Sequence, residues 1–228
     1  MSIQIAKSAG FCFGVSRAVE TVEEAAKQGK TVVTLGPIIH NRHVVDRFDQ
    51  MGVRVIEKPE EAKQGMTVII RSHGVSRDVY QRLEQQGVEI IDATCPFVKR
   101  IHGIVEKAEA AGELPIIMGT RSHPEVEGIA GWCSHCKIFE NPEELEEWAK
   151  SGEISAEMPI CMVSQTTSTE ISWKKSVQIA KKQFTNVKIF DTICKATESR
   201  QSEAANLSTI CQAMVVVGDT QSSNTGRL

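Results

Sequence analysis

Two kinds of hydrophobic pattern alternate along this chain. Between Val15 and Ala26 the apolar residues recur at i, i+3 and i+4, which predicts an amphipathic helix that begins just after Cys12. Short continuous apolar runs, such as "KTVVTLG" and "MTVIIRSHG", predict buried strands that end near a glycine. Helical patterns ("HVVDRFDQMG", "VSRDVYQRLEQQG") lie between the strand patterns. This alternation predicts the α/β class, with small, mostly parallel sheets that are covered by helices.

One local pattern occurs three times. An apolar run leads to an aspartate and then a cysteine in "VEIIDATCPFVKR" and "VKIFDTICKATES", and a helical pattern follows, as it does after Cys12. A glycine lies 24 residues after each cysteine, and a polar residue lies four residues after each glycine. These triplets are Cys12, Gly36 and His40; Cys95, Gly119 and His123; and Cys194, Gly218 and Ser222. The repeat predicts three α/β units.

We expect the units to be residues 13–95, residues 96–193, and residues 1–12 together with 194–228. The third unit includes the run "AMVVVG" as a predicted strand, but it has only the first half of the repeat. The chain is therefore expected to be cut short. Because ligands of open α/β sheets bind at the carboxyl ends of the strands, the cysteines and polar residues there are candidate site residues.

Composition excludes several classes of function. The chain has 228 residues, 41% of them hydrophobic and 24% charged, with a net charge of −3, which argues against a partner that is a nucleic acid or a membrane surface. No apolar run approaches the roughly 20 residues that span a bilayer. The start, "MSIQIAKSAGFCFG", lacks the pattern of a signal or transit peptide, so we expect a cytoplasmic protein.

The chain contains seven cysteines, and three of them stand out. A single cysteine is most often a buried core residue, and we interpret Cys161 and Cys211 in this way. The pair in "WCSHC", Cys133 and Cys136, resembles half a zinc site, but no second pair follows at zinc-ribbon spacing, so we interpret it as structural or incidental. Three cysteines at matching positions of a repeat, in contrast, could ligate three irons of a cubane iron–sulfur cluster and leave the fourth iron open.

The polar residues at the strand ends predict an anion site. Hydroxyl, amide and imidazole groups on such loops can hold phosphate, whereas a P-loop or a G-x-G-x-x-G motif is absent from the sequence. The candidates are His40, His73, His123, Thr166, Thr167, Ser222, Ser223 and Asn224. Glu125, in "SHPEVEG", is either an ordinary carboxylate in a first helical turn or a proton carrier beside the ligand.

Motifs spread over nearly the whole chain carry a family resemblance. "SAGFCFGV", "LGPIIHN", "IIRSHGV", "DATCPFV", "GTRSHPEVEG", "SQTT", "DTIC" and "SSN" occur in order between residues 8 and 224. Together they resemble the 4-hydroxy-3-methylbut-2-enyl diphosphate reductases, which catalyse the last step of the methylerythritol phosphate route to isoprenoids. The family is similar in having three α/β domains in a pseudo-threefold arrangement around a central [4Fe–4S] cluster.

The resemblance implies a role for each candidate. Cys12, Cys95 and Cys194 would ligate the cluster, and the fourth iron would bind the allylic hydroxyl of the substrate. Two electrons and two protons would remove that hydroxyl as water, to give isopentenyl and dimethylallyl diphosphates. Glu125 would relay protons with Thr166 nearby, and reduced ferredoxin or flavodoxin would supply the electrons. The diphosphate would be held by His40, His73, His123, Ser222, Ser223 and Asn224.

The resemblance also implies one departure, because the family continues beyond the "SSN" loop. An alternative function is therefore a truncated, non-catalytic protein that binds a cluster or a metal on the same fold.

Overall fold

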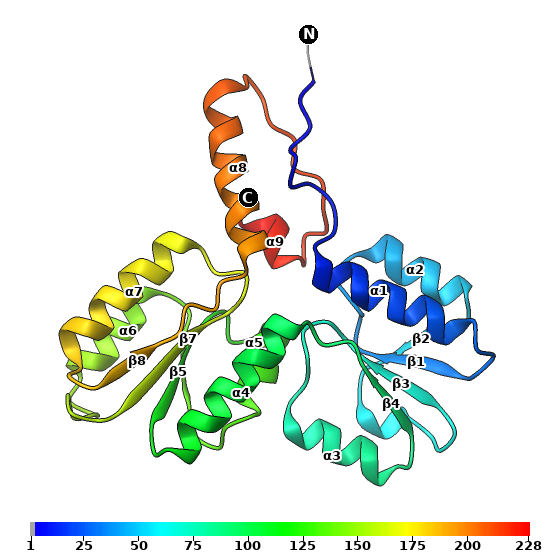
Figure 1. The fold of residues 1–228 in the computed structure, drawn as a ribbon, viewed down its shortest axis with the longest axis horizontal. Helices are drawn as coiled ribbons and strands as arrows, with labels where there is room; N and C mark the ends of the chain where they lie inside the picture. Colours follow the sequence, from blue (N-terminus) through cyan, green and yellow to red (C-terminus); the bar gives the residue numbers. More distant parts are fainter. Residues whose placement is uncertain (1–2) are drawn as a thin grey trace.

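The computed structural model describes residues 3–228 and contains two β-sheets of four strands each (Figure 1). The strand order is β2-β1-β3-β4 in the first sheet and β6-β5-β7-β8 in the second. The strand pairs of both sheets are parallel. The predicted α/β class with parallel sheets is confirmed, and the two sheets repeat one topology.

The elements of the first sheet and its helices occupy the N-terminal part of the chain. They are α1 (Phe13–Ala26), β1 (Val32–Leu35), α2 (Arg42–Gln50), β2 (Arg54–Ile56), the 3₁₀ turn η1 (Pro59–Glu61), β3 (Thr67–Ile70), α3 (Arg77–Gln85) and β4 (Glu89–Asp92). The second group consists of α4 (Pro96–Ala110), β5 (Leu114–Met118), α5 (Pro124–Ala130), β6 (Lys137–Phe139), α6 (Pro142–Lys150), β7 (Ile160–Ser164), α7 (Glu170–Gln183) and β8 (Val187–Ile189). The C-terminal part contains α8 (Lys195–Ile210) and α9 (Ser223–Gly226).

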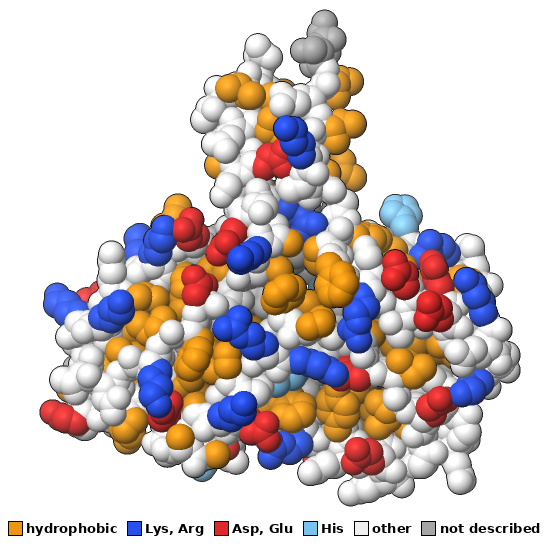
Figure 2. All heavy atoms as spheres, in the orientation of Figure 1, with side chains coloured by type: hydrophobic (Ala, Val, Ile, Leu, Met, Phe, Trp, Pro, Cys, Tyr) orange, Lys and Arg blue, Asp and Glu red, His pale blue; other side chains and the backbone are white. Residues whose placement is uncertain are grey.

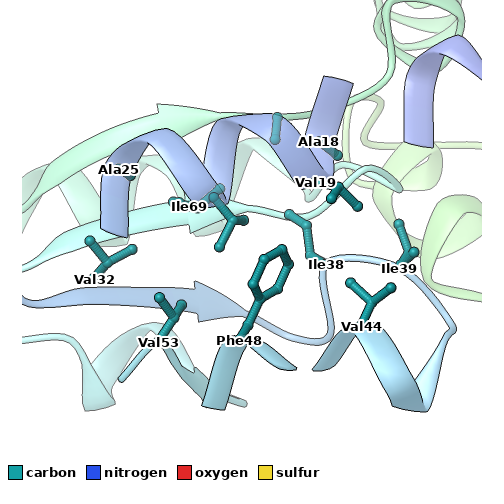
Figure 3. Close-up of a cluster of buried hydrophobic side chains, with 12 residues drawn as sticks. Ala18, Val19, Ala25, Val32, Ile38, Ile39, Val44, Phe48, Val53 and Ile69 are labelled. Atoms are coloured by element: carbon teal, nitrogen blue, oxygen red, sulfur yellow. The ribbon is translucent and has the colours of Figure 1, made fainter. Parts of the chain in front are cut away.

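Both faces of the first sheet are buried under helices. Successive side chains of a strand point to opposite faces, so Val32 packs under α1 and α2 whereas its neighbour Val33 packs against α3. Figure 3 shows Phe48 of α2 pointing toward Ile69 of β3 within the first of these clusters. Burial on both faces explains why these strands read as continuous apolar runs rather than alternating ones.

The second sheet is packed in the same way. One face carries Met118 and Met162 under α6 and α7, and the other carries Ile117 and Val163 under α4 and α5. Since α5 begins at the carboxyl end of β5, its first turn lies at the edge of the sheet where ligands of α/β proteins bind.

The C-terminal part differs from the two sheet units. Helix α8 projects away from both sheets, and the N-terminal segment lies in the same projecting part of the molecule before it enters α1 (Figure 1). The Glu203 carboxylate accepts hydrogen bonds from the backbone N–H of Lys7 (2.7 Å) and of Ser8 (2.8 Å). Arg200 donates to the carbonyl oxygens of Ser8 (3.1 Å) and Gly10 (2.8 Å). The chain just before Cys12 is thereby fixed to the helix that follows Cys194.

The predicted strand in "AMVVVG" does not form, so that prediction was wrong. Residues 213–218 have no strand structure, and Val215 and Val217 are 87% and 92% exposed. A strand needs a neighbour to satisfy its backbone hydrogen bonds, and no strand among residues 3–228 lies beside this run. Figure 2 shows further apolar side chains on the surface of the projecting part.

Within residues 3–228, no helix combines the length and the apolar character needed to cross a bilayer.

Candidate metal centre and anion pocket

Each of the three repeated cysteines lies at the start of a helix. Cys12, Cys95 and Cys194 are the N-cap residues of α1, α4 and α8. None of the three has the side-chain capping hydrogen bond that Ser, Thr, Asp or Asn commonly forms at this position. The first turn of each helix presents free backbone N–H groups beside the sulfur atom, and cysteine ligates metal through this atom.

The backbone links two of these cysteines to the strand-end loops in the same way. The N–H of Cys95 donates to the carbonyl of Ser72 after β3 (3.0 Å), and the N–H of Cys194 donates to the carbonyl of Thr166 after β7 (2.9 Å). His73 follows Ser72 directly, so the polar loop residues are held next to the cysteines.

The thiols also lie close together. Burial raises the pKa of Cys95, and the neighbouring Cys12 and Cys194 raise it further, while the backbone N–H groups after Cys95 act in the opposite direction. The start of α1 approaches Cys95 so closely that a Cβ on Gly14 would lie 2.6 Å from the Cys95 Sγ. Three thiols at helix N-caps, with Cys95 close to the other two, fit a cubane cluster with three protein ligands.

Cys161 and Cys211 lie outside the candidate metal centre. Cys161 is fully buried under α4 and α5, which confirms its interpretation as a core residue. Cys211 is only half-buried at the C-terminal end of α8, so the same interpretation was wrong for it. The reason is that α8 has little packed against it: Thr197 is the only buried residue that this helix contributes.

The three predicted histidines form one cluster. The ring centroids are 4.7 Å apart for His40 and His73, 5.8 Å for His40 and His123, and 5.5 Å for His73 and His123. One ring nitrogen from each histidine lies within 4.8 Å of one from each of the other two. The residues follow β1, β3 and β5, so parallel strands of two sheets bring them together at their carboxyl ends.

Burial keeps the three imidazoles neutral. Loss of solvent lowers the pKa of all three, to about 4 for His123, and the positive charge of Arg71 lowers each further. Both ring nitrogens of His40 and Nδ1 of His73 are buried without a hydrogen-bond partner among residues 3–228. Buried polar atoms without partners are costly, so this cluster is suited to a ligand that brings several acceptor oxygens.

Two arginines complete the pocket, and neither was predicted from the sequence. A Cβ on Gly36 would lie 2.5 Å from Arg71 Nη1, so the absence of a side chain there leaves room for the guanidinium. Arg227 donates to the carbonyl of Thr167 at 2.5 Å, and its charge contributes to the lowered pKa of His123. Both lie within three residues of predicted site residues, in "IIRSHG" and "SSNTGRL", which is the signal that could have found them.

Glu125 and Thr166 form a buried pair. Glu125 is only 3% exposed, and its two carboxylate oxygens accept from the Thr166 backbone N–H (2.6 Å) and hydroxyl (2.7 Å). Burial raises the pKa of Glu125, whereas both Thr166 bonds and the charge of Arg227 act to lower it. The His123 side chain accepts from the Glu125 N–H (3.1 Å) as the cap of α5, so the carboxyl group and the histidine cluster share one helix start.

The last predicted residues lie at the start of α9. Ser222 is the N-cap of this short helix, and Asn224 Oδ1 accepts from the Thr197 hydroxyl in the first turn of α8 (3.2 Å). Within residues 3–228, neither Ser222 nor Ser223 forms a hydrogen bond with the three histidines. The loop is nevertheless tied to both sheet units, because Asp219 accepts from the Arg42 N–H (3.2 Å) and Arg227 reaches Thr167.

Fold and site together define a class: an α/β protein in which cysteines at helix N-caps lie beside a cluster of neutral imidazoles and two half-buried guanidinium groups. Residues 3–228 match the family described as LytB protein, and the chain belongs to this family.

Curated relatives carry a functional name. The chain is 46% identical to the 4-hydroxy-3-methylbut-2-enyl diphosphate reductase of Caldanaerobacter subterraneus subsp. tengcongensis, over 100% of this chain and 79% of that protein. It is 40% identical to the protein of the same name from Aquifex aeolicus, over 100% of this chain and 78% of that protein.

Solved structures agree with the fold. The structure of the E-1-hydroxy-2-methyl-but-2-enyl-4-diphosphate reductase from Plasmodium falciparum superimposes with a TM-score of 0.90 at 31% identity, over 96% of this chain and 69% of that one. A second structure, described as the terminal enzyme of the non-mevalonate pathway, gives a TM-score of 0.76 at 39% identity, over 99% of this chain and 79% of that one.

Proposed function

We propose that this chain is an iron–sulfur reductase that converts 4-hydroxy-3-methylbut-2-enyl diphosphate to isopentenyl and dimethylallyl diphosphates by reductive removal of the allylic hydroxyl. Membership of the LytB family and the names of its relatives support the proposal. The observation that carries it is that three cysteines at helix N-caps lie close to a buried carboxyl group and three neutral imidazoles.

Cys12, Cys95 and Cys194 would hold a [4Fe–4S] cluster. When bound, the cluster would supply electrons and an open iron site for the hydroxyl group of the substrate. The first sheet unit (13–95), the second (96–193) and a third formed by residues 1–12 with 194–228 would each contribute one ligand. The hydrogen bonds of Arg200 and Glu203 to residues 7–10 support this assignment, because they join the two segments of the third unit.

The diphosphate would occupy the histidine cluster. Neutral imidazoles donate N–H groups to phosphate oxygens, and the nearby guanidinium of Arg71 balances the negative charge. Ser222, Ser223 and Asn224 would add donors from the start of α9. The unpartnered ring nitrogens of His40 and His73 support this placement.

Glu125 would deliver a proton to the leaving hydroxyl, with Thr166 as its partner. Overall, one substrate molecule takes up two electrons and two protons and loses one water. A carboxyl group whose pKa is raised by burial holds a proton closer to neutral pH than an exposed one does, which suits a general acid. The Thr166 backbone N–H and hydroxyl each hold one of the two carboxylate oxygens in place.

The electrons would come from a reduced ferredoxin or flavodoxin. The chain would act in the cytoplasm, where thiols are kept reduced.

Substitution of Glu125 by glutamine tests the proposal. Glutamine keeps the shape but cannot deliver the proton, so substrate-dependent oxidation of a reduced viologen dye under anaerobic conditions should fall by about 10²–10⁴-fold. The iron content should not change, because Glu125 is not a cluster ligand in the proposal. If the unsubstituted, cluster-loaded chain shows no substrate-dependent oxidation at all, the non-catalytic alternative replaces the reductase.

A further inference from the structure

Exposed phenylalanine side chains lie beside two of the candidate cluster ligands. Phe11 and Phe13 flank Cys12 and are 51% and 66% exposed, and Phe97, two residues after Cys95, is 46% exposed. Phenylalanine is commonly buried in soluble proteins, and apolar side chains that gather on a surface mark an interaction site. Neither the anion pocket nor the proposed metal centre uses these three rings.

The three rings belong to one surface, because the helix starts that carry them meet. A Cβ on Gly14 would lie 2.6 Å from the Cys95 Sγ, so the first turn of α1 is in contact with the start of α4. Figure 2 shows apolar side chains directly below the projecting part, over the starts of α1 and α4, with Lys and Arg side chains around them.

Three cations accompany the rings. Arg17 lies one helical turn after Phe13, and Arg100 lies one turn after Phe97, so each cation shares a helix face with a phenylalanine. Lys195 is the first residue of α8, directly after the third candidate ligand. Arg100 and Lys195 are exposed, and neither forms an ion pair with another residue in the range 3–228. We call the three phenylalanines and these three cations the docking surface.

Nearby carboxylates face other cations. Asp92 forms an ion pair with Lys99 on α4. The charges of Asp191 and of Glu198 act on Lys174, on α7. The docking surface therefore presents positive charge to solvent, although the whole chain has a net charge of −3.

We propose that the docking surface binds an acidic electron-carrier protein and brings the redox centre of that protein next to the candidate cluster ligands. The inference rests on the proposed function, because only a reductase needs electrons at this position. Aromatic residues at the centre of a contact, with Arg beside them and a polar rim, are the composition of protein–protein interfaces. Complementary charge selects an acidic partner and orients it, since the net charge of the rest of the chain repels such a partner.

The electron balance of the docking step is simple. In each docking event one reduced carrier loses one electron to the chain and leaves in its oxidised form. Two events supply the two electrons of one turnover.

Anaerobic calorimetry of the cluster-loaded chain with an acidic ferredoxin tests the proposal. Arg100→Glu and Lys195→Glu should each weaken the affinity by about 3–30-fold at low ionic strength, because charge reversal replaces an attraction by a repulsion of similar size. The effect should shrink at about 0.5 M salt, where exposed charges are screened. Phe13→Ala should weaken the affinity by about 10-fold at both ionic strengths, because salt does not screen an apolar contact.

Lys63→Glu is the matched control for the charge reversals. Lys63 is exposed in the loop before β3, at the amino end of this strand, whereas the docking surface lies near the carboxyl ends. This variant should bind ferredoxin as the unsubstituted chain does. Equal weakening in Lys63→Glu and in Arg100→Glu would overturn the proposal, as would an affinity that does not depend on salt.

Dye-driven turnover separates the docking surface from the reaction itself. A reduced viologen is too small to need a docking surface, so Arg100→Glu should keep the dye-driven rate and lose ferredoxin-driven rate at limiting ferredoxin. Dye-driven turnover without ferredoxin binding overturns the docking surface alone, whereas absence of dye-driven turnover in the unsubstituted chain overturns the proposed function. Self-association of the chain that Phe13→Ala abolishes would assign the surface to a second copy of the chain, and would also overturn the proposal.

Discussion

Replacing Thr166 by valine tests how the buried carboxyl group of Glu125 is controlled. The Thr166 hydroxyl donates to Glu125 at 2.7 Å, while the backbone N–H of the same residue keeps its own bond at 2.6 Å. Valine removes the first bond and leaves the second. A hydrogen bond to a charged group contributes about 1.5–3 kcal/mol and one to a neutral group about 0.5–1.5 kcal/mol. The ionised carboxylate therefore loses about 1–1.5 kcal/mol more than the protonated one, which raises the pKa of Glu125 by about one unit.

The direction of the pH dependence follows from the raised pKa. Burial holds the pKa of Glu125 in the folded chain above its unfolded value. The stability that this raised pKa contributes is complete below the unfolded pKa and is lost as the pH rises through the folded-state pKa. In Thr166→Val the loss of stability continues to higher pH, because the pKa of Glu125 is higher. The free energy of unfolding of the variant should therefore be lower than that of the unsubstituted chain at both pH values, and the difference should be larger at pH 8 than at pH 5.

Urea unfolding at the two pH values, followed by tryptophan fluorescence, measures the difference. Thr167→Val is a matched control, because the Thr167 hydroxyl is buried without a partner among residues 3–228 and its removal breaks no hydrogen bond. A loss in Thr166→Val that is equal at pH 5 and pH 8 would refute the reasoning. The same pH dependence in Thr167→Val would refute it as well.

Three further predictions concern the metal centre and the anion pocket. Serine at Cys12, Cys95 or Cys194 should remove most of the roughly four irons per chain expected for a cubane cluster, whereas Cys133→Ser should keep them; iron loss in the latter would reverse the assignment. Gly14→Ala should lower the iron content with little change in circular dichroism, because the new Cβ would crowd the Cys95 Sγ. Gly103→Ala is the control, because no atom lies within 4 Å of a Cβ at that position, and equal iron contents in the two variants would contradict the prediction. The chain should take up protons when it binds inorganic diphosphate at pH 7, because a bound anion raises the lowered pKa values of the imidazoles, and the affinity should therefore fall as the pH rises. Calorimetry in two buffers of different ionisation enthalpy measures the number of protons taken up, and zero uptake would contradict the prediction.

The sequence predicted the helix starts at the repeated cysteines, because a helix start is encoded by a few neighbouring residues. Each repeated cysteine was expected just before a helix, and each is an N-cap, because an apolar period and a helix start are encoded within a few residues. The strand in 213–218 was wrong for the complementary reason: an apolar run does not report whether a neighbouring strand is present. The sequence places Arg227 three residues after Asn224, but its contact with Thr167 joins residues 60 positions apart, and no local pattern encodes that contact.

The attachment of the N-terminal segment to α8 has a consequence for biosynthesis. Cys12 is among the first residues to be synthesised, but Glu203, whose carboxylate holds Ser8, lies 195 residues after Ser8 in the chain. At about 5–20 residues per second, the delay between the two is on the order of 10–40 s. The first parallel sheet can form during this interval, since all its strands lie within the N-terminal part of the chain. We therefore expect a nascent chain to carry a folded first sheet and a Cys12 without its anchor, and iron to be inserted only after α8 has left the ribosome.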